Sequence, residues 1–144
     1  PRDMRSLYQK IRTGFDLVLG YRVNSDSDEN KDPKEKTMIG RFEMFIASPV
    51  SNFIIRLLSG VGKFKNYNTN FRIVRAETWK SFQTIEARHF FLFETIFRAQ
   101  RQGAKITEIP VSFLPRKFGE SKVSFFKQAP GYFLKLLRYT FLEK

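Results

Sequence analysis

The sequence contains no cysteine and only one histidine, His89. The lack of cysteine excludes disulfides, zinc–thiolate sites and thiol catalysis. A single imidazole also leaves no pair of histidines for a metal cage. Long apolar runs are missing too: the longest stretch without a charged residue covers residues 44–55, well short of the roughly 20 apolar residues that span a bilayer.

Positive charge is what the chain has in excess. Its 144 residues contain 26 Lys and Arg against 14 Asp and Glu, a net charge of +12. A charge of that size favours an anionic partner: nucleic acid, a phospholipid surface or a phosphorylated small molecule. Apolar residues make up 42% of the chain, which is enough for a core and excludes a fully disordered protein. The length fits a single domain over residues 1–144. Because Pro1 starts within a helical pattern, we expect this domain to be part of a longer one.

Hydrophobic spacing predicts an α/β fold in which helices and strands alternate. We expect helices over residues 2–12, 40–60, 77–82, 90–102 and 130–142, and strands over residues 16–20, 71–75, 105–109 and 111–114. Gly14 and Gly103 are suited to end helices. Pro49 should kink or split the second helix, and Pro110 should separate the last two strands. Pro130 suits the first turn of the last helix.

Two segments stand apart from this pattern. Residues 24–37 contain no apolar residue except Pro33, which predicts a mobile surface loop. Residues 123–144 form an amphipathic tail that mixes aromatic and basic residues. Its apolar stripe, flanked by Lys135 and Arg138, contains Phe133, Leu136, Leu137 and Phe141. Such a helix suits the headgroup region of an anionic membrane, although the stripe could instead pack on the sheet or on the rest of the protein.

Cations follow or lie within several of the predicted strands. Arg22 comes directly after the first strand, where ligands bind in open α/β sheets, and Arg72 lies within the second. Arg116 opens a loop that contains Gly119 and ends at Lys122. Guanidinium and ammonium groups from separate strand ends could converge on a diphosphate. The alternative is that each is an ordinary solvated charge. The sequence contains no complete catalytic triad, Walker loop or dinucleotide-binding motif.

Short motifs occur in a characteristic order along nearly the whole chain. They are Asp-Leu-Val-Leu-Gly-Tyr-Arg up to Arg22, Ser48-x-x-x-Asn52, Phe71-Arg72, Phe93-Glu94, Glu-Ile-Pro-Val-Ser-Phe from Glu108, and Arg-Lys-Phe-Gly-Glu-Ser-Lys from Arg116. This order resembles the dolichyl-phosphate mannosyltransferase-like glycosyltransferases, which are inverting A-type enzymes that transfer one sugar from a nucleotide sugar to a polyprenyl phosphate. The last two motifs are the most specific. The resemblance implies the C-terminal half of an A-type glycosyltransferase fold: a short mixed sheet flanked by helices, with an amphipathic terminal helix.

The resemblance also implies site residues. Arg22, Arg41 and Ser48 would bind the acceptor phosphate, with residues 24–37 in the position of the acceptor loop. The donor diphosphate would be bound by Arg72, Arg116, Gly119 and Lys122. A divalent cation, Mg²⁺ or Mn²⁺, is expected in the parent protein. The Asp-x-Asp metal site of the family belongs to the preceding nucleotide-binding half, so no metal ligand is expected in this chain.

The chain departs from the family pattern at one motif. The family usually has Asp-Pro-x-x-Gly-Phe-Arg, whereas residues 66–72 read Asn-Tyr-Asn-Thr-Asn-Phe-Arg. Asn70 takes the glycine position and can still adopt positive φ. Asn66 takes the place of the aspartate, so no catalytic residue is assigned. If that carboxylate positions the acceptor or a metal, the chemistry of this protein is altered.

These features predict the acceptor-side half of a polyprenyl-phosphate glycosyltransferase, peripheral on the cytoplasmic face of a membrane. Its expected partners are a nucleotide sugar, a polyprenyl phosphate, an anionic membrane surface and an N-terminal nucleotide-binding half. One alternative is a non-catalytic basic module that docks on an anionic membrane or nucleic acid. No nucleic-acid reader motif is present, which speaks against nucleic acid. Another alternative is a degenerate transferase half kept for assembly. In either transferase reading, these residues alone are expected to be inactive.

Overall fold

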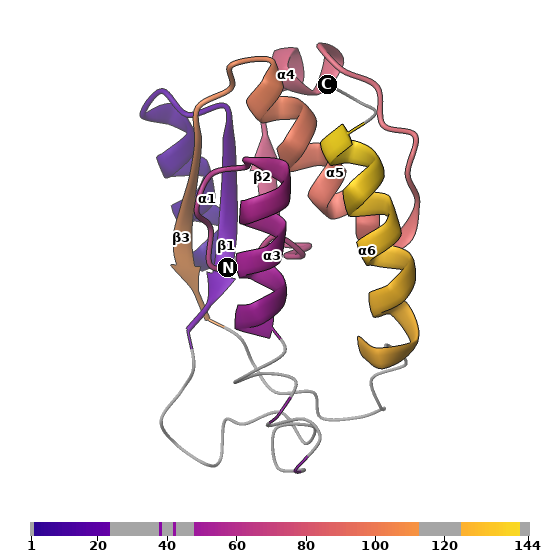
Figure 1. Cartoon of the computed structure of the whole chain (residues 1–144). Helices are drawn as coiled ribbons and strands as arrows, with labels where there is room; N and C mark the ends of the chain where they lie inside the picture. The colour runs from indigo at the N-terminus through magenta and orange to yellow at the C-terminus, as the bar shows by residue number, and fades with distance from the viewer. Residues whose placement is uncertain (1, 24–37, 39–41, 43–47, 113–124, 142–144) are drawn as a thin grey trace. The chain divides into compact units, whose positions relative to one another are not determined.

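The structure, a computed structural model, describes residues 2–23, 38, 42, 48–112 and 125–141 (Figure 1). The chain divides into two compact units, residues 1–23 with 61–112 and residues 24–60 with 113–144. The first unit contains α1 (Arg2–Arg12), β1 (Leu17–Arg22), β2 (Arg72–Val74), α4 (Ala76–Lys80), α5 (Arg88–Arg101) and β3 (Ile106–Val111). The second contains α3 (Ser48–Ser59) and α6 (Phe125–Phe141). The predicted loops over residues 24–37 and 116–122 lie outside the described residues, and the single domain over residues 1–144 stays a prediction.

The described residues of the first unit form a three-stranded mixed sheet with strand order β2-β1-β3. The central strand β1 runs antiparallel to β2 and parallel to β3. Residues 17–20 of β1 are all buried, and such an unbroken apolar run is typical of a strand covered on both faces. The predicted α/β fold with a short mixed sheet is thus confirmed, and it is consistent with half of an A-type glycosyltransferase fold.

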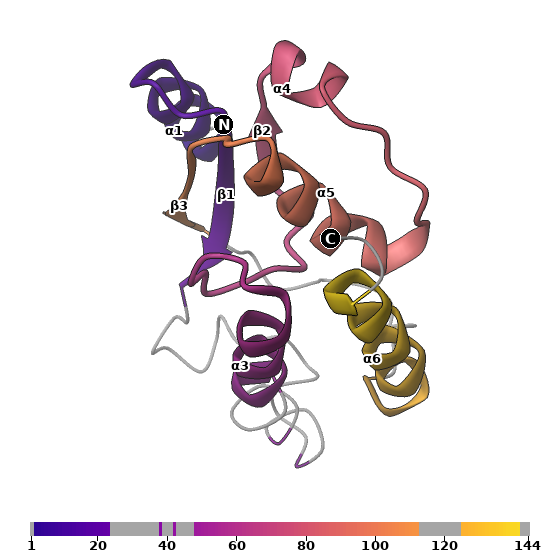
Figure 2. The same cartoon turned by 45° about the horizontal axis from the view of Figure 1, so that its top comes forward.

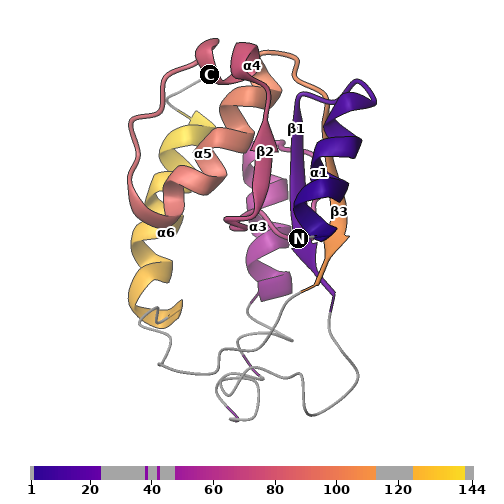
Figure 3. The same cartoon turned by 180° about the vertical axis from the view of Figure 1, so that it is seen from behind.

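Helix α1 covers one face of the sheet (Figure 3). Leu7 and Ile11 lie on the same side of α1 because they are four residues apart, and they form a buried cluster with Val18 of β1. Partly buried apolar side chains pack against this cluster: Phe15, Ile73 and Ile109. The turn that follows α1 contains Gly14 at φ +98°, a conformation that L side chains rarely adopt. The predicted end of this helix is confirmed.

Helix α5 lies on the other side of the sheet from α1 (Figures 1 and 2). Its Phe93, Ile96 and Phe97 are buried. Leu17 and Leu19 of β1 alternate with Val18, so they project away from α1, and both are fully buried. Because β1 is covered on both faces, only side chains at its ends can reach a ligand.

The third strand corrects one prediction. Pro110 does not separate two extended segments, because β3 runs unbroken from Ile106 to Val111 and pairs Pro110 with Tyr21. β3 lies at the edge of the described sheet. A proline in an edge strand costs no ladder hydrogen bond where its nitrogen faces away from the neighbouring strand.

In the second unit, α3 and α6 pack against each other. Ile55 of α3 and Leu136 and Tyr139 of α6 are buried. Of the helix predicted over residues 40–60, the structure describes α3, which begins at Ser48. Pro49 lies in the first turn of α3, where a missing N–H costs little. No helix in the described parts of the chain combines the length and apolar character needed to cross a bilayer.

Helix α6 differs from its prediction in two ways. It begins at Phe125 rather than at Pro130, so Pro130 lies inside the helix and removes one backbone hydrogen bond there. The predicted apolar stripe is also divided, because Leu136 is buried whereas Phe133 and Phe141 are exposed. The spacing predicted which residues share a broad side of the helix, but not where the packed part of that side ends.

Candidate functional site

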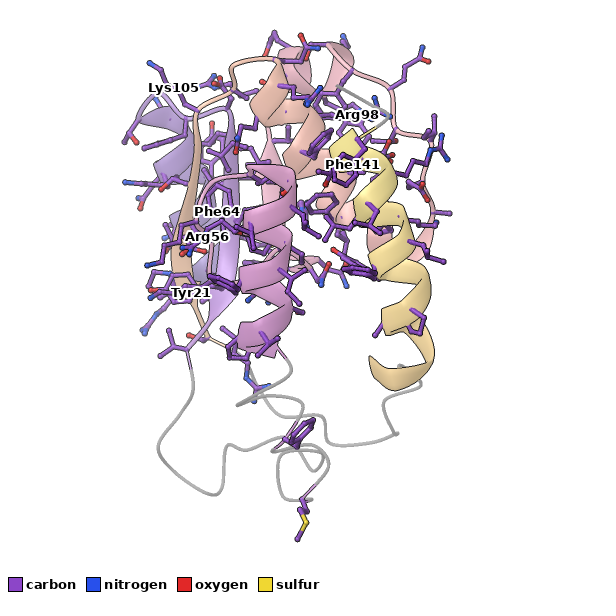
Figure 4. All side chains as sticks on the ribbon, viewed as in Figure 1. Tyr21, Arg56, Phe64, Arg98, Lys105 and Phe141 are labelled. Atoms are coloured by element: carbon purple, nitrogen blue, oxygen red, sulfur yellow. The ribbon has the colours of Figure 1, made fainter. Side chains whose placement is uncertain are left out.

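The parallel pairing of β1 and β3 brings the carboxyl ends of both strands to one edge of the sheet. Arg22, the last residue of β1, pairs with Val111, the last residue of β3. Figure 4 marks the two edges, with Tyr21 near the carboxyl ends and Lys105 at the amino end of β3. Ligands of open α/β sheets bind beyond the carboxyl ends of the strands. The edge at Arg22 is therefore the candidate functional site.

Arg22 is the predicted site residue that the structure places at this edge, where it is partly exposed. The chain leaves the sheet at Ser112, whose backbone N–H donates to Asp3 Oδ2 at 3.0 Å, so the first turn of α1 is fastened to the end of β3. The remaining predicted phosphate-binding residues of the loops lie outside the described residues: Arg41, Arg116, Gly119 and Lys122. Their roles stay predictions.

The opposite, amino edge is closed by internal bonds. The Arg75 guanidinium donates from Nε to Phe15 O and from Nη2 to Ile11 O, both at 2.8 Å. Asp16 accepts the backbone N–H of Lys105 at 2.7 Å and lies 3.7 Å from Arg75 Nε. These groups tie the end of α1 to the starts of β1 and β3, so their charges have a structural use.

A segment that we name the crossing loop, residues 61–71, passes over the carboxyl end of β1. Gly20 donates its N–H to Phe71 O at 2.8 Å and accepts from Thr69 Oγ1 at 2.7 Å. A Cβ at position 20 would lie 2.8 Å from Val111 Cγ1 and 2.9 Å from Phe71 Cδ1. Only glycine allows the loop to approach the strand this closely.

The crossing loop is also anchored to α5 and β3. The hydroxyl of the buried Tyr67 donates to Gly62 O at 2.7 Å. Gly62 N–H donates to Gln100 Oε1 of α5 at 2.7 Å. Lys65 N–H donates to Glu108 Oε2 of β3 at 2.8 Å. The backbone of the loop is therefore held at a fixed place beside the candidate site.

Arg72, predicted to bind the donor diphosphate, uses its guanidinium within the fold. Nε donates to Thr69 O at 2.9 Å, Nη1 to Leu92 O at 2.8 Å, and Nη2 to Tyr67 O at 3.4 Å and to Thr69 O. These bonds join the last turn of the crossing loop to α5. A contact between Arg72 and the donor stays a prediction, whereas this structural role was not evident from the sequence.

Lys65 and Asn66 are consecutive residues of the crossing loop, and Lys65 faces Tyr21. Lys65 Nζ is 4.0 Å from the centroid of the Tyr21 ring. Asn66 Oδ1 accepts the N–H of Asn68 at 2.9 Å, a local turn that asparagine and aspartate side chains both form. Asn66 therefore supplies the turn that an aspartate would supply, without its negative charge.

A buried carboxylate organises the segment before α5. Glu94 is fully buried and accepts from Ile85 N–H at 3.0 Å, from Glu86 N–H at 2.9 Å and from Arg98 Nε at 2.6 Å. Its neighbour Phe93 lies in the core. This pair of residues, singled out in the sequence, thus has a structural explanation.

The second unit presents an apolar and basic surface. Ser48 begins α3, and its predicted contact with the acceptor phosphate stays a prediction. Large apolar side chains are exposed on both helices: Val50, Phe53 and Leu57 of α3, and Phe133, Leu134 and Phe141 of α6. The residues of these two helices include Arg56, Lys127, Lys135 and Arg138 but no aspartate or glutamate.

Among the described residues, no group of three or more His, Cys, Asp or Glu side chains could hold a metal ion. These residues therefore do not supply a ligand set for a divalent cation.

Sequence reasoning missed the residues that fix the crossing loop. Glu108 carried a signal, since an acidic residue in the middle of an apolar edge strand needs a hydrogen-bond partner. Thr69 and Gln100 carried none, because their partners are main-chain atoms of segments far away in the sequence. Nothing in the sequence distinguishes Lys65 from the other cations, because Tyr21, which its ammonium contacts, is distant along the chain.

No family model matches the chain. Curated proteins to which it is similar include the Undecaprenyl-phosphate mannosyltransferase of Micrococcus luteus, 28% identical over 127 residues that cover 86% of this chain and 48% of that protein. The Polyprenol monophosphomannose synthase of Mycolicibacterium smegmatis is 24% identical over 127 residues, 86% of this chain and 44% of that protein. The chain spans just under half the length of these relatives. The similarity supports assignment to a glycosyltransferase family.

Proposed function

We propose that this chain is the acceptor side of an inverting glycosyltransferase that moves a sugar from a nucleotide sugar to a polyprenyl phosphate. The observation that carries the proposal is Arg22 at the shared carboxyl edge of β1 and β3, in a chain similar to two proteins named as enzymes of this class. Their names favour mannose as the sugar.

In the proposed reaction, an oxygen of the lipid phosphate attacks the anomeric carbon of the sugar. A carbon–oxygen bond to the lipid phosphate forms while the bond to the nucleotide diphosphate breaks, and the diphosphate leaves with the electron pair. The nucleophile is already an anion, so no strong general base is required. This fits a sequence with a single histidine, His89.

Charge placement is then the main task of the protein. The Arg22 guanidinium offers a planar fork for two phosphate oxygens, which both binds and orients the acceptor. Arg116 and Lys122 would stabilise the leaving diphosphate. In the whole protein we also expect a divalent cation at that diphosphate, with ligands outside the described residues.

We further propose that the protein works at the surface of an anionic membrane, on its cytoplasmic side. The exposed Phe53 of α3 and Phe141 of α6, with cations and no acids on either helix, support contact with anionic headgroups and the acyl boundary below them. A polyprenyl phosphate is a membrane lipid, so a peripheral position would bring the enzyme to its acceptor.

A second candidate function is a degenerate transferase half that binds the lipid but is kept for assembly. Asn66 favours it, because the resemblance implies an aspartate at this position. The two candidates share the binding surface and differ in turnover.

Arg22→Ala tests the acceptor assignment in the full-length protein. We expect kcat/KM for the polyprenyl phosphate to fall by at least about 10-fold, or 1.4 kcal/mol, through loss of charge-assisted hydrogen bonds. The KM for the nucleotide sugar should stay nearly unchanged.

The matched control is Lys105→Ala, which removes an exposed cation at the amino edge of the same sheet. It should leave kcat/KM for the polyprenyl phosphate and KM for the nucleotide sugar unchanged. If Arg22→Ala has the acceptor kinetics of the control, Arg22 does not bind the acceptor phosphate.

A further inference from the structure

The crossing loop places a second cation against Tyr21, the residue that precedes Arg22 in β1. The Lys65 backbone is fixed by its N–H bond to Glu108, and its ammonium lies 4.0 Å from the centroid of the Tyr21 ring. An ammonium over an aromatic face gains about 0.5–1 kcal/mol at an exposed site. An otherwise flexible lysine head is therefore biased toward the carboxyl end of β1.

Tyr21 and Arg22 are consecutive residues of β1, so their side chains project to opposite faces of the sheet. A ligand just beyond the strand end would then meet Arg22 from one face and Lys65, held by Tyr21, from the other. A guanidinium fork and an ammonium point charge are complementary ways to bind phosphate oxygens.

The neighbouring charges agree with an anionic ligand. Asn66 keeps the turn of the crossing loop through its bond to Asn68 and brings no negative charge beside Lys65. Two acidic groups lie at this edge, and each accepts a main-chain N–H: Glu108 accepts that of Lys65, and Asp3 accepts that of Ser112.

We propose that Lys65 binds the terminal phosphate of the acceptor together with Arg22, and that Tyr21 positions the Lys65 ammonium. This inference rests on the proposed function and adds two residues to its acceptor site. A phosphate monoester carries a charge of about −1.5 to −2 at pH 7, which two cations match better than one. Because Asn66 is neutral, it does not repel the phosphate that Lys65 would bind.

The test measures the Kd of the chain for farnesyl phosphate, a short prenyl phosphate monoester, by isothermal titration calorimetry, with inorganic phosphate as a second probe. Lys65→Gln should weaken farnesyl phosphate binding by about 10-fold, the effect of one lost charge-assisted contact. Lys63→Gln is the matched control, since Lys63 is exposed in the same loop two residues earlier, and it should change the Kd less than 2-fold.

Two further variants test the role of the ring. Tyr21→Phe keeps an aromatic face and should bind like the unmodified chain, whereas Tyr21→Leu should weaken binding in the same direction as Lys65→Gln. Lys65→Arg keeps the cation and should retain most of the affinity. Weakening by Tyr21→Leu should be absent in a Lys65→Gln background if the ring acts through Lys65.

The outcomes separate this inference from the proposed function. If Arg22→Ala weakens binding but Lys65→Gln behaves like Lys63→Gln, the role of Lys65 is wrong and the acceptor site stands. If farnesyl phosphate does not bind, or Arg22→Ala has no effect on its binding, the acceptor site itself is wrong. Equal Lys65 effects on both probes identify the phosphate as the group recognised, and an effect on inorganic phosphate alone would contradict a lipid acceptor.

Discussion

At the scale of residues, side-chain bonds to main-chain atoms hold the candidate site together. Thr69 bonds to Gly20, Arg72 to Leu92, and Glu108 to the backbone of Lys65. Such bonds fix the crossing loop without depending on the identity of its outward-facing side chains. Position 65 can therefore change the charge of the site while the loop keeps its course, and position 66 can do so between asparagine and aspartate, which both form the turn.

The first prediction concerns Gly20, where the crossing loop and β1 meet. Gly20→Ala should lower the free energy of unfolding by about 1–3 kcal/mol, the usual cost of overpacking a core. The added Cβ would lie 3.1 Å from the carbonyl oxygen of Phe71 as well as against two side chains, and a backbone atom cannot rotate away. The midpoint of urea unfolding measures the effect.

Gly131→Ala is its control. Gly131 lies inside α6, and a Cβ there would meet no atom within 4 Å. Alanine in a helix interior should stabilise by about 0.5–1 kcal/mol. Equal effects at the two glycines would contradict the close packing described at Gly20.

The second prediction concerns the buried ion pair of α5. Glu94 is fully buried while the Arg98 side chain is 24% exposed. Arg98→Ala should therefore cost about 3–5 kcal/mol, because it leaves a buried carboxylate without its cation. Adding Glu94→Gln to Arg98→Ala should recover part of that loss, since a neutral amide needs no counter-ion.

Urea unfolding of the single and double variants checks this coupling. Arg101→Ala, at an exposed position in the last turn of the same helix, serves as the control and should cost far less. A double variant no more stable than Arg98→Ala would show that the pair is not coupled.

At the scale of elements, regular hydrophobic spacing carried the successful predictions. α1 and α5 were predicted from runs of helical character that end at Gly14 and Gly103, and β1 from a short unbroken apolar run. The errors came at prolines. Pro110 lies in an unbroken strand and Pro130 lies inside a helix. The cost of a proline depends on whether its nitrogen faces a neighbouring strand or carbonyl, and the sequence alone does not reveal that direction.

The candidate site was predictable only in part, because one of its cations is positioned by residues far away in the sequence. Arg22 follows an apolar run, so its place at a strand end could be inferred from local pattern. Lys65 acquires its place through Glu108 and Tyr21, which are distant in the sequence. Contacts of that kind depend on the packed fold and leave no local signal.

The third prediction concerns the helices of the second unit. Replacing Phe133, Leu134 and Phe141 together by serine should strongly weaken binding to vesicles with anionic lipid. These side chains are 45%, 67% and 66% exposed, so the change should remove the proposed apolar contact with the membrane while leaving the buried Leu136 and Tyr139 in place. Because cations near an anionic surface contribute about 1 kcal/mol each at low salt, binding should also weaken as salt rises. Co-sedimentation with vesicles measures both effects.

The control replaces exposed apolar residues elsewhere. Met4 and Tyr8 of α1 are 61% and 55% exposed, and their change to serine should leave vesicle binding intact. These substitutions are a sharper test than removing α6, which would also remove the buried Leu136 and Tyr139. Equal loss in both variants would contradict a membrane surface on α6.

At the scale of the whole molecule, charge and fold support the same proposal. A net charge of +12 suits anionic substrates and an anionic surface, and the mixed sheet brings Arg22 to the shared carboxyl end of β1 and β3. The chain matches just under half the length of its curated relatives, and its described residues contain no metal-ligand cluster. From the share of the relatives that is matched, we propose that sugar transfer needs a longer protein than these 144 residues.

A sugar-transfer assay tests the central proposal most directly. Radiolabelled, nucleotide-activated mannose is incubated with a short polyprenyl phosphate and either the full-length protein or the 144-residue chain, and the label in the lipid fraction is measured. The full-length protein should transfer label to the polyprenyl phosphate, and the isolated chain should not. A folded full-length protein that transfers none of the common nucleotide-activated sugars to the lipid, or robust transfer by the isolated chain, would contradict the account.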